Sequence, residues 1–218
     1  VFEQLNQGYA DINDAVKNKH EKRFEQLKDR FKKQFNCLPK FYCRAPGRVN
    51  IIGEHIDYCG YSVLPAAIEQ DFIMAYMPVE EGEEGADEIQ IYNIEHATYD
   101  PIVLSTDPYQ KMKEDAHFAN YFLCGFKAIV AHHEDLRSQV TKPKGMKIMI
   151  DSHVPPASGL SSSSAFTVCA AVTTMHANGM ADKISQQRLA DITIHAERMA
   201  GTACGGMDQT ISIMGEMG

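Results

Sequence analysis

The sequence predicts an α+β protein, a two-layer α/β sandwich in which helices pack on a mixed β-sheet. Two observations lead to this fold class. Segments with the alternating apolar pattern of strands are interleaved with segments that repeat at helical intervals, and the interleaving follows no regular βαβ period. The 218 residues are also 44% hydrophobic and 23% charged, which is the composition of a folded protein able to bury one substantial core or two small ones.

The individual elements follow from local patterns in chain order. The first 36 residues are predicted to be helical, with Phe24, Leu27 and Phe31 spaced as a packing stripe among lysines and glutamates. Ser185 has the side chain of an N-cap, so a helix is expected to begin there. The expected strands are 40–44, 71–77, 88–94 and 146–151, and the expected later helices are 120–132, 162–176 and 185–201.

Composition and charge argue against several classes of function. A net charge of -8 and a pI near 5.6 argue against nucleic-acid and anionic-membrane partners, which require a basic surface. The six cysteines form no CxxC pair, so a reduced, cytoplasmic compartment is expected. No apolar run is long enough to span a bilayer, and the N-terminus lacks a signal-peptide pattern. The chain stops directly after an apolar segment, which suggests a piece of a longer polypeptide.

The segment at residues 44–65 concentrates polar chemistry. Between glycines that let the backbone turn, it carries four charged or ionisable side chains, Arg48, Glu54, His55 and Asp57. Carboxylates accept several hydrogen bonds and a guanidinium donates them in a fixed fork, which is how sugar hydroxyls are recognised. The segment therefore predicts a site for a polar ligand. Taken alone, it fits equally well a charged loop that caps a strand and faces water.

A serine-rich run, Ser158-Gly-Leu-Ser-Ser-Ser-Ser-Ala165, lies between an expected strand and an expected helix. Free backbone N–H groups and the positive end of the helix dipole would face an incoming anion there. Serine hydroxyls also suit Mg²⁺, which prefers oxygen ligands. The run therefore predicts a phosphate site, although a flexible linker or a plain helix cap would have the same composition. No GxxxxGK[ST] or GxGxxG motif is present, so neither an ordinary P-loop nor a dinucleotide fold is supported.

Two carboxylates near residue 200 suggest a further task. Glu197 is expected at a helix end and Asp208 in a glycine-bounded turn. One could hold a metal ion while the other meets a substrate hydroxyl. The simpler alternatives are a surface glutamate paired with an arginine and a turn aspartate that bonds its own backbone.

Three segments together resemble the GHMP small-molecule kinases, in particular the galactokinase branch. They are Gly-Arg-Val-Asn-Ile-Ile-Gly-Glu-His-Ile-Asp-Tyr, Gly-Leu-Ser-Ser-Ser-Ser-Ala and Gly-Gly-Met-Asp-Gln, in the family's order. The resemblance runs from about residue 40 to the end. The segment at 120–127 and the fourfold serine are most similar to N-acetylgalactosamine kinase, whereas the Thr-Ala-Cys-Gly stretch at 202–205 is similar to the galactokinase pattern. The choice of sugar therefore stays open.

The resemblance implies a fold, an activity and two catalytic roles. The fold would be that of the GHMP kinase N-terminal domain, like domain 2 of ribosomal protein S5, over residues 37–218, after a helical segment at 1–36. The activity would be transfer of the γ-phosphoryl group of ATP, with Mg²⁺, to the anomeric hydroxyl of N-acetylgalactosamine or galactose, mostly by positioning and charge stabilisation. Asp208 would be the catalytic base, and Arg48 would be its charge-stabilising partner.

The resemblance also implies three groups of binding residues. The sugar would contact Arg48, Glu54, His55, Asp57, Asp208 and the backbone of Gly205. The nucleotide would be bound by Gly159, Leu160, Ser161, Ser162, Ser163 and Ser164. Mg²⁺ would be held by Ser163 and Glu197, with the serine register open by one position.

Members of this family are nearly twice as long and carry a second domain, so this chain would hold an incomplete active site. The protein would be a monomer whose partners are a sugar and ATP. A rival function is a non-catalytic sugar sensor that regulates a protein partner, but the serine-alanine loop that is shortened in such sensors is complete here. A kinase for mevalonate or homoserine is disfavoured, because those substrates lack the ring hydroxyls that Glu54, His55 and Asp57 would bind.

Overall fold

The computed structural model describes residues 1–3, 14–95, 98–114, 118–131, 134–199, 201 and 204–216. Its strands are β1 (Phe41–Ile52), β2 (Leu64–Val79), β3 (Glu88–Asn93), β4 (Ile102–Ser105) and β5 (Gly145–Ser152). Its helices are α2 (Asp14–Phe35), the 3-10 helix η1 (Asp57–Cys59), α3 (Ala119–Val130), α4 (Glu134–Arg137), α5 (Ser162–Ala177), α6 (Gln186–Arg198) and α7 (Met207–Met214).

The strands form a mixed sheet in the order β1-β2-β5-β3-β4. β3 and β5 pair in parallel, with Ile91 opposite Ile148. β3 and β4 pair in antiparallel, with Ile89 opposite Leu104. All four side chains are buried, as the alternating pattern around residues 89 and 91 predicts. The predicted α+β class with a mixed sheet is confirmed.

Most predicted elements are present with shifted ends. α5 and α6 begin where the sequence predicts, and Ser185 caps α6 by accepting a hydrogen bond from the N–H of Arg188 at 3.2 Å. The predicted helix at 120–132 is α3, although residue 132 lies outside the described residues, as do residues 4–13 of the predicted helical segment. The short elements β4 and α4 were not predicted.

Two predictions about the motif segments were wrong in a way that matters for the site. The strand predicted at 40–44 continues as β1 to Ile52, through Pro46 and Gly47. Gly47 serves close approach here rather than a turn, because a Cβ on it would lie 2.8 Å from the carbonyl oxygen of Leu160. The turn predicted around Asp208 is instead the first turn of α7.

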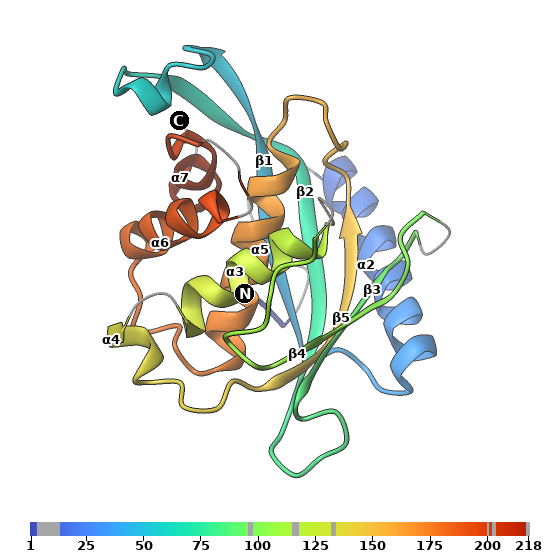
Figure 1. Cartoon of the computed structure of the whole chain (residues 1–218). Coiled ribbons are helices and arrows are strands. Elements are labelled where there is room, and N and C mark those ends of the chain that lie inside the picture. The colour runs from blue at the N-terminus through green and yellow to red at the C-terminus, as the bar shows by residue number, and fades with distance from the viewer. Residues whose placement is uncertain are drawn as a thin grey trace. The chain divides into compact units, whose positions relative to one another are not determined.

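The described chain forms two compact units, and β1 and β2 contribute residues to both. One unit consists of residues 1–44, 73–106 and 144–151. In it, α2 lies beside β3 and β5 (Figure 1). The stripe predicted on this helix is packing, since its members are buried in one cluster with strand residues: Phe24, Leu27, Phe31, Tyr42, Ile73, Ala75 and Met149.

An ion pair also links α2 to the end of β5. Arg23 donates from Nε to Oδ2 of Asp151 at 2.6 Å and from Nη2 to the Asp151 carbonyl at 3.3 Å. The two side chains are 5% and 9% exposed. A buried pair of this kind is costly to break, because the remaining charge stays in a medium of low polarity.

The other unit consists of residues 45–72, 107–143 and 152–218 and contains α3, α5, α6 and α7. α3 lies close to α5 (Figure 1). The approach depends on Gly125, whose Cβ, if present, would lie 2.4 Å from the carbonyl oxygen of Thr167 and 2.7 Å from Cβ of Ala170. This packing fixes α5, whose first turn carries the serines of the predicted site. Among the described residues, no helix combines the length and the apolar character that crossing a membrane requires.

Candidate active site

A pocket of about 430 Å³ in the second unit brings the three motif segments together. Its walls come from β1, from the turn that contains η1, from the loop before α5, and from α5, α6 and α7. Ten of the residues predicted from the sequence line it: Arg48, Glu54, His55, Asp57, Gly159, Leu160, Ser163, Ser164, Glu197 and Asp208.

Three of the predicted residues do not line this pocket in the described part of the chain. Ser161 and Ser162 lie at the start of α5, where they shape the loop. Gly205 lies behind Asp57, as its contacts below show. If these three residues contact a ligand as predicted, they would do so through backbone atoms and not through a side chain that lines the pocket.

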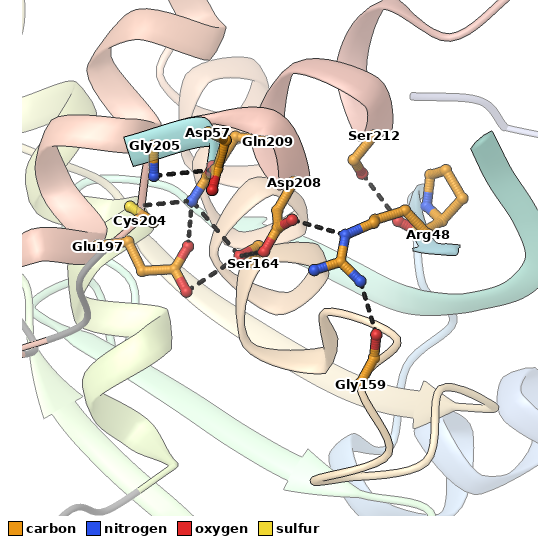
Figure 2. Close-up of polar contacts among 11 residues, drawn as sticks. Arg48, Asp57, Gly159, Ser164, Glu197, Cys204, Gly205, Asp208, Gln209 and Ser212 are labelled. Atoms are coloured by element: carbon orange, nitrogen blue, oxygen red, sulfur yellow. Dashed lines mark hydrogen bonds and ion pairs between the residues drawn. The ribbon is translucent and has the colours of Figure 1, made fainter. Parts of the chain in front are cut away.

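Arg48 and Asp208 form the central ion pair of the pocket (Figure 2). Arg48 donates from Nε to Oδ1 of Asp208 at 2.6 Å, across 160 residues of sequence. Its Nη1 donates to the carbonyl of Gly159 at 2.6 Å, and its backbone N–H donates to the carbonyl of Leu160 at 3.1 Å. The two side chains of the ion pair are 13% and 20% exposed, so they are shielded yet open to a ligand. One guanidinium thus joins the predicted base to the serine loop.

Asp208 owes its place to the start of α7. Gly206 is the N-cap residue, with a φ of 109° that favours glycine. A Cβ on Gly206 would also lie 2.5 Å from Cδ1 of Ile194, a side-chain end on α6 that would have to move. A carboxylate in the first turn of a helix is stabilised by the unpaired N–H groups and the dipole there. The Gly-Gly-Met-Asp sequence therefore builds a helix start that presents Asp208 to Arg48.

The turn that contains η1 packs directly against the backbone of Gly205. The N–H of Gly205 donates to Oδ2 of Asp57 at 3.1 Å. A Cβ on Gly205 would lie 2.4 Å from the carbonyl carbon of Asp57 and from the N atom of Tyr58. Asp57 is thereby oriented, while Glu54 and His55 remain exposed on the pocket wall. Three groups able to bond hydroxyls thus lie on one side of the pocket.

The loop before α5 has a strained backbone. Gly159 has a φ of 75°, and two residues with side chains, Ala157 and Ser161, have φ values of 54° and 56°. Such values are rare outside glycine and persist where the surrounding structure enforces them. The hydroxyl of Ser161 is buried and has no hydrogen-bond partner among the described residues. The loop ends at the N-terminus of a helix of 16 residues, whose first N–H groups have no partner within the helix and suit an anion.

Glu197 is fully buried at the end of α6, which excludes the alternative of a surface glutamate. Its Oε1 accepts a hydrogen bond from Oγ of Ser164 at 3.1 Å, and its Oε2 accepts one from Nε2 of Gln209 (Figure 2). Burial raises the pKa of Glu197, and the charge of Asp208 raises it further, whereas hydrogen bonds from Ser164, Ser163 and Gln209 lower it. The net shift is upward, because burial is the largest effect.

The oxygen atoms around Glu197 fit a hard divalent cation. Ser163 and Ser164 supply hydroxyls, and Oδ2 of Asp208 lies 3.5 Å from Oγ of Ser164. No group of three or more His, Cys, Asp and Glu side chains gathers within the ranges that the structure describes. Mg²⁺ commonly binds through one or two carboxylates together with water and substrate phosphates. The residues present therefore suit an ion shared with a ligand.

Some residues of the site were missed by the sequence interpretation. Asn50, Tyr58 and Cys204 also line the pocket. Asn50 is two positions after Arg48, so both lie on one face of β1, and a longer predicted strand would have indicated it. Burial raises the pKa of the Cys204 thiol, and the charge of Glu197 adds to the effect, so the thiolate that a nucleophile needs is disfavoured.

Two models of protein families match this chain. The galactokinase galactose-binding signature matches residues 29–78, and the GHMP kinase N-terminal domain matches residues 120–216. Between them, the two matches contain every residue predicted for the site.

Curated proteins of similar sequence are named galactokinase. The one from Schizosaccharomyces pombe is 37% identical over 215 residues, which cover 95% of this chain and 41% of that protein. The one from Candida maltosa is 40% identical over 176 residues, which cover 81% of this chain and 78% of that protein. The chain spans between 38% and 41% of the length of four of the galactokinases that it matches.

The fold is similar to that of a solved galactokinase. The crystal structure of Lactococcus lactis galactokinase complexed with galactose has a TM-score of 0.68 and is 24% identical, over 85% of this chain and 45% of that one. This likeness shows the fold of the GHMP kinase N-terminal domain, as the sequence predicts.

Proposed function

Since the chain belongs to the galactokinase family of GHMP kinases, we propose that it is the N-terminal part of an ATP-dependent kinase that phosphorylates the anomeric hydroxyl of galactose. The observation that carries this proposal is the ion pair of Arg48 and Asp208, which lies in one pocket with the hydroxyl-binding groups and the serine loop. Residues 1–36 are then a helical segment and residues 37–218 the kinase N-terminal domain, and a second domain of the complete kinase contributes the rest of the nucleotide and sugar sites.

The sugar lies against the turn that contains η1. Glu54, His55 and Asp57 accept or donate hydrogen bonds to ring hydroxyls, and Gly205 holds Asp57 in place. Asp208 receives the proton of the attacking hydroxyl. Fixing this hydroxyl beside the phosphoryl group removes most of the entropic barrier to the transfer.

The triphosphate lies on the serine loop and the N-terminus of α5, where free N–H groups and the helix dipole favour negative charge. Arg48 already donates to the Gly159 carbonyl and to Asp208, and no dashed line in Figure 2 meets its remaining guanidinium nitrogen, Nη2, whose N–H groups are directed to the phosphoryl group in this proposal. They stabilise charge that develops on the transferred group. Mg²⁺, when bound by Glu197 and Ser163, neutralises phosphate charge.

Galactose is the preferred sugar because the curated relatives are named galactokinase. N-acetylgalactosamine is the second candidate, on the likeness of the segment at 120–127 to kinases for that sugar. That segment lies in α3, and its buried residues serve the packing of this helix. It does not line the pocket in the described structure, so it says little about the group at the 2-position of the sugar.

The proposal is tested with Asp208→Asn in the complete protein. We expect kcat for galactose phosphorylation to fall roughly 10²- to 10⁴-fold, as for loss of a general base, while galactose binding stays measurable by calorimetry. Ser212→Ala is the matched control, because Ser212 lies on the same helix and does not line the pocket. Undiminished turnover in Asp208→Asn would refute the assigned base.

The same assay separates the rival functions. A wild-type protein that binds galactose and ATP without turnover would be a sugar sensor. Parallel rates with galactose and N-acetylgalactosamine decide between the two sugars, and a higher kcat/KM for the second would overturn the preference stated here.

A further inference from the structure

Gln209 follows the predicted base directly, yet its side chain points to a different partner. Successive residues of an α-helix project about 100° apart, so the first turn of α7 sends Asp208 to Arg48 and Gln209 to Glu197 (Figure 2). The Gln209 side chain is fully buried. No role was predicted for it from the sequence.

The contacts of Gln209 complete the surroundings of one carboxylate. Its Nε2 donates to Oε2 of Glu197, while Oγ of Ser164 donates to Oε1 of the same group at 3.1 Å. Nε2 also lies 3.4 Å from Oγ of Ser164 and 3.8 Å from Sγ of Cys204. Glu197 is therefore held on one oxygen from α5 and on the other from α7, which leaves its plane little freedom to rotate.

The NH₂ group of Gln209 faces three acceptors, on Glu197, Ser164 and Cys204. Its Oε1 is buried and has no hydrogen-bond partner among the described residues. Turning the amide over would bring Oε1 against a carboxylate oxygen of Glu197, so only the NH₂ end of the amide can face this carboxylate. Within the described residues, the amide therefore keeps its NH₂ group on Glu197 although its Oε1 has no partner.

We propose that Gln209 is a positioning residue, which holds the Glu197 carboxylate in the orientation that binds a divalent cation. The inference rests on the proposed function, since it takes Glu197 as the ligand of the magnesium ion that accompanies ATP. Groups that hydrogen-bond to a metal ligand fix its direction, and their loss commonly weakens metal binding by one to two orders of magnitude. Gln209 acts through Glu197 and does not touch the substrate.

The test measures cation binding directly in the complete protein. Mn²⁺ is titrated into protein that carries galactose and a non-hydrolysable ATP analogue, and bound Mn²⁺ is measured from the loss of its EPR signal relative to the analogue alone. We expect Gln209→Met, which keeps the length of the side chain but lacks the donor, to raise the Kd for Mn²⁺ roughly 10- to 100-fold. Gln209→Asn, whose amide is too short to reach Glu197, gives a second variant should the first fail to fold.

Thr193→Val provides the control, because Thr193 is equally buried on α6 but bonds only to carbonyls of its own helix. Steady-state kinetics give a second readout, in which the KM for magnesium rises in the Gln209 variants, saturating magnesium restores kcat, and the KM for galactose is unchanged. Equal Mn²⁺ affinity in wild type and variants, or a parallel loss of galactose affinity, would overturn the positioning role. Absence of tight Mn²⁺ in the wild type would instead count against the metal site of the proposed function.

Discussion

Replacing Gly205 with alanine should disturb the sugar side of the pocket through one added carbon atom. The new Cβ would lie 2.4 Å from the Asp57 carbonyl carbon and from the Tyr58 nitrogen, and 2.5 Å from Oδ2 of Asp57. These neighbours are backbone or are tied to it, so they cannot rotate away. Gly205 does not have a positive φ, so alanine meets no backbone strain and the effect comes from the overlap alone.

The size of the effect follows from these distances. Real Cβ atoms almost never approach closer than 3.0 Å, so the two backbones must separate by roughly 0.6 Å. The hydrogen bond from the Gly205 N–H to Asp57, now 3.1 Å, would then lengthen beyond about 3.6 Å and be lost. Asp57 is then free to leave the orientation that the bond imposes. Binding of galactose must restore this orientation, which costs up to the value of a hydrogen bond to a charged group, about 1.5–3 kcal/mol, and every 1.4 kcal/mol is tenfold in affinity. We expect the Kd for galactose to rise roughly 10- to 100-fold.

The assay is calorimetric titration of galactose into the complete protein, together with thermal unfolding. Gly145→Ala is the matched control, because a Cβ there would lie 2.3 Å from the Gly85 carbonyl oxygen, and both glycines belong to the other unit and do not line the pocket. Both variants should lose about 1–3 kcal/mol of stability, but only Gly205→Ala should lose sugar affinity. An unchanged Kd in Gly205→Ala, or an equal loss in both variants, would refute this reasoning.

Three further predictions concern charged groups. Arg48→Lys should lower kcat roughly 10²- to 10³-fold in the galactose assay, because an ammonium cannot join Asp208 and the loop carbonyl as a planar fork does. In the presence of chelator, Glu197→Gln should gain stability over wild type as pH rises above 4.5, the ordinary carboxyl value. The raised pKa means that the folded protein holds this proton more tightly than the unfolded chain, so wild type loses stability as the pH rises from 4.5 to the pKa of the folded protein. A stability difference between the two proteins that does not change with pH in denaturant titrations would contradict this. Arg23→Met should lower the free energy of unfolding by about 3–5 kcal/mol, and adding Asp151→Leu should recover part of that loss in the same titrations.

The local signals in the sequence predicted elements wherever one short segment carries the information. Ser185 bonds the N–H three residues later, and Ile89 and Ile91 alternate with less buried neighbours, so both patterns are complete within a few residues. α7 was missed because it has only eight residues and follows two glycines, which alone indicate a turn. The continuation of β1 was missed because Pro46 and Gly47 disfavour a strand unless a distant segment packs on them.

For the candidate site too, short motifs were informative and contacts between distant segments were not predicted. The residue types in the three motifs predicted the kind of ligand, and the resemblance to a family predicted their joint use. The burial of Glu197 could not be predicted, because its partners Ser164 and Gln209 come from two other helices. The contact of Gly205 with Asp57 spans 148 residues, and no local pattern records it.

The double engagement of Arg48 links two parts of the pocket. Its guanidinium holds the Gly159 carbonyl at one end and Asp208 at the other, so a ligand that draws the loop away also changes what faces the carboxylate. Linkage between two binding events is reciprocal. If the nucleotide changes the affinity for the sugar by this route, the sugar changes the affinity for the nucleotide by the same factor. In the kinase proposed above, a single side chain would thereby couple the binding of nucleotide and sugar before any bond is broken.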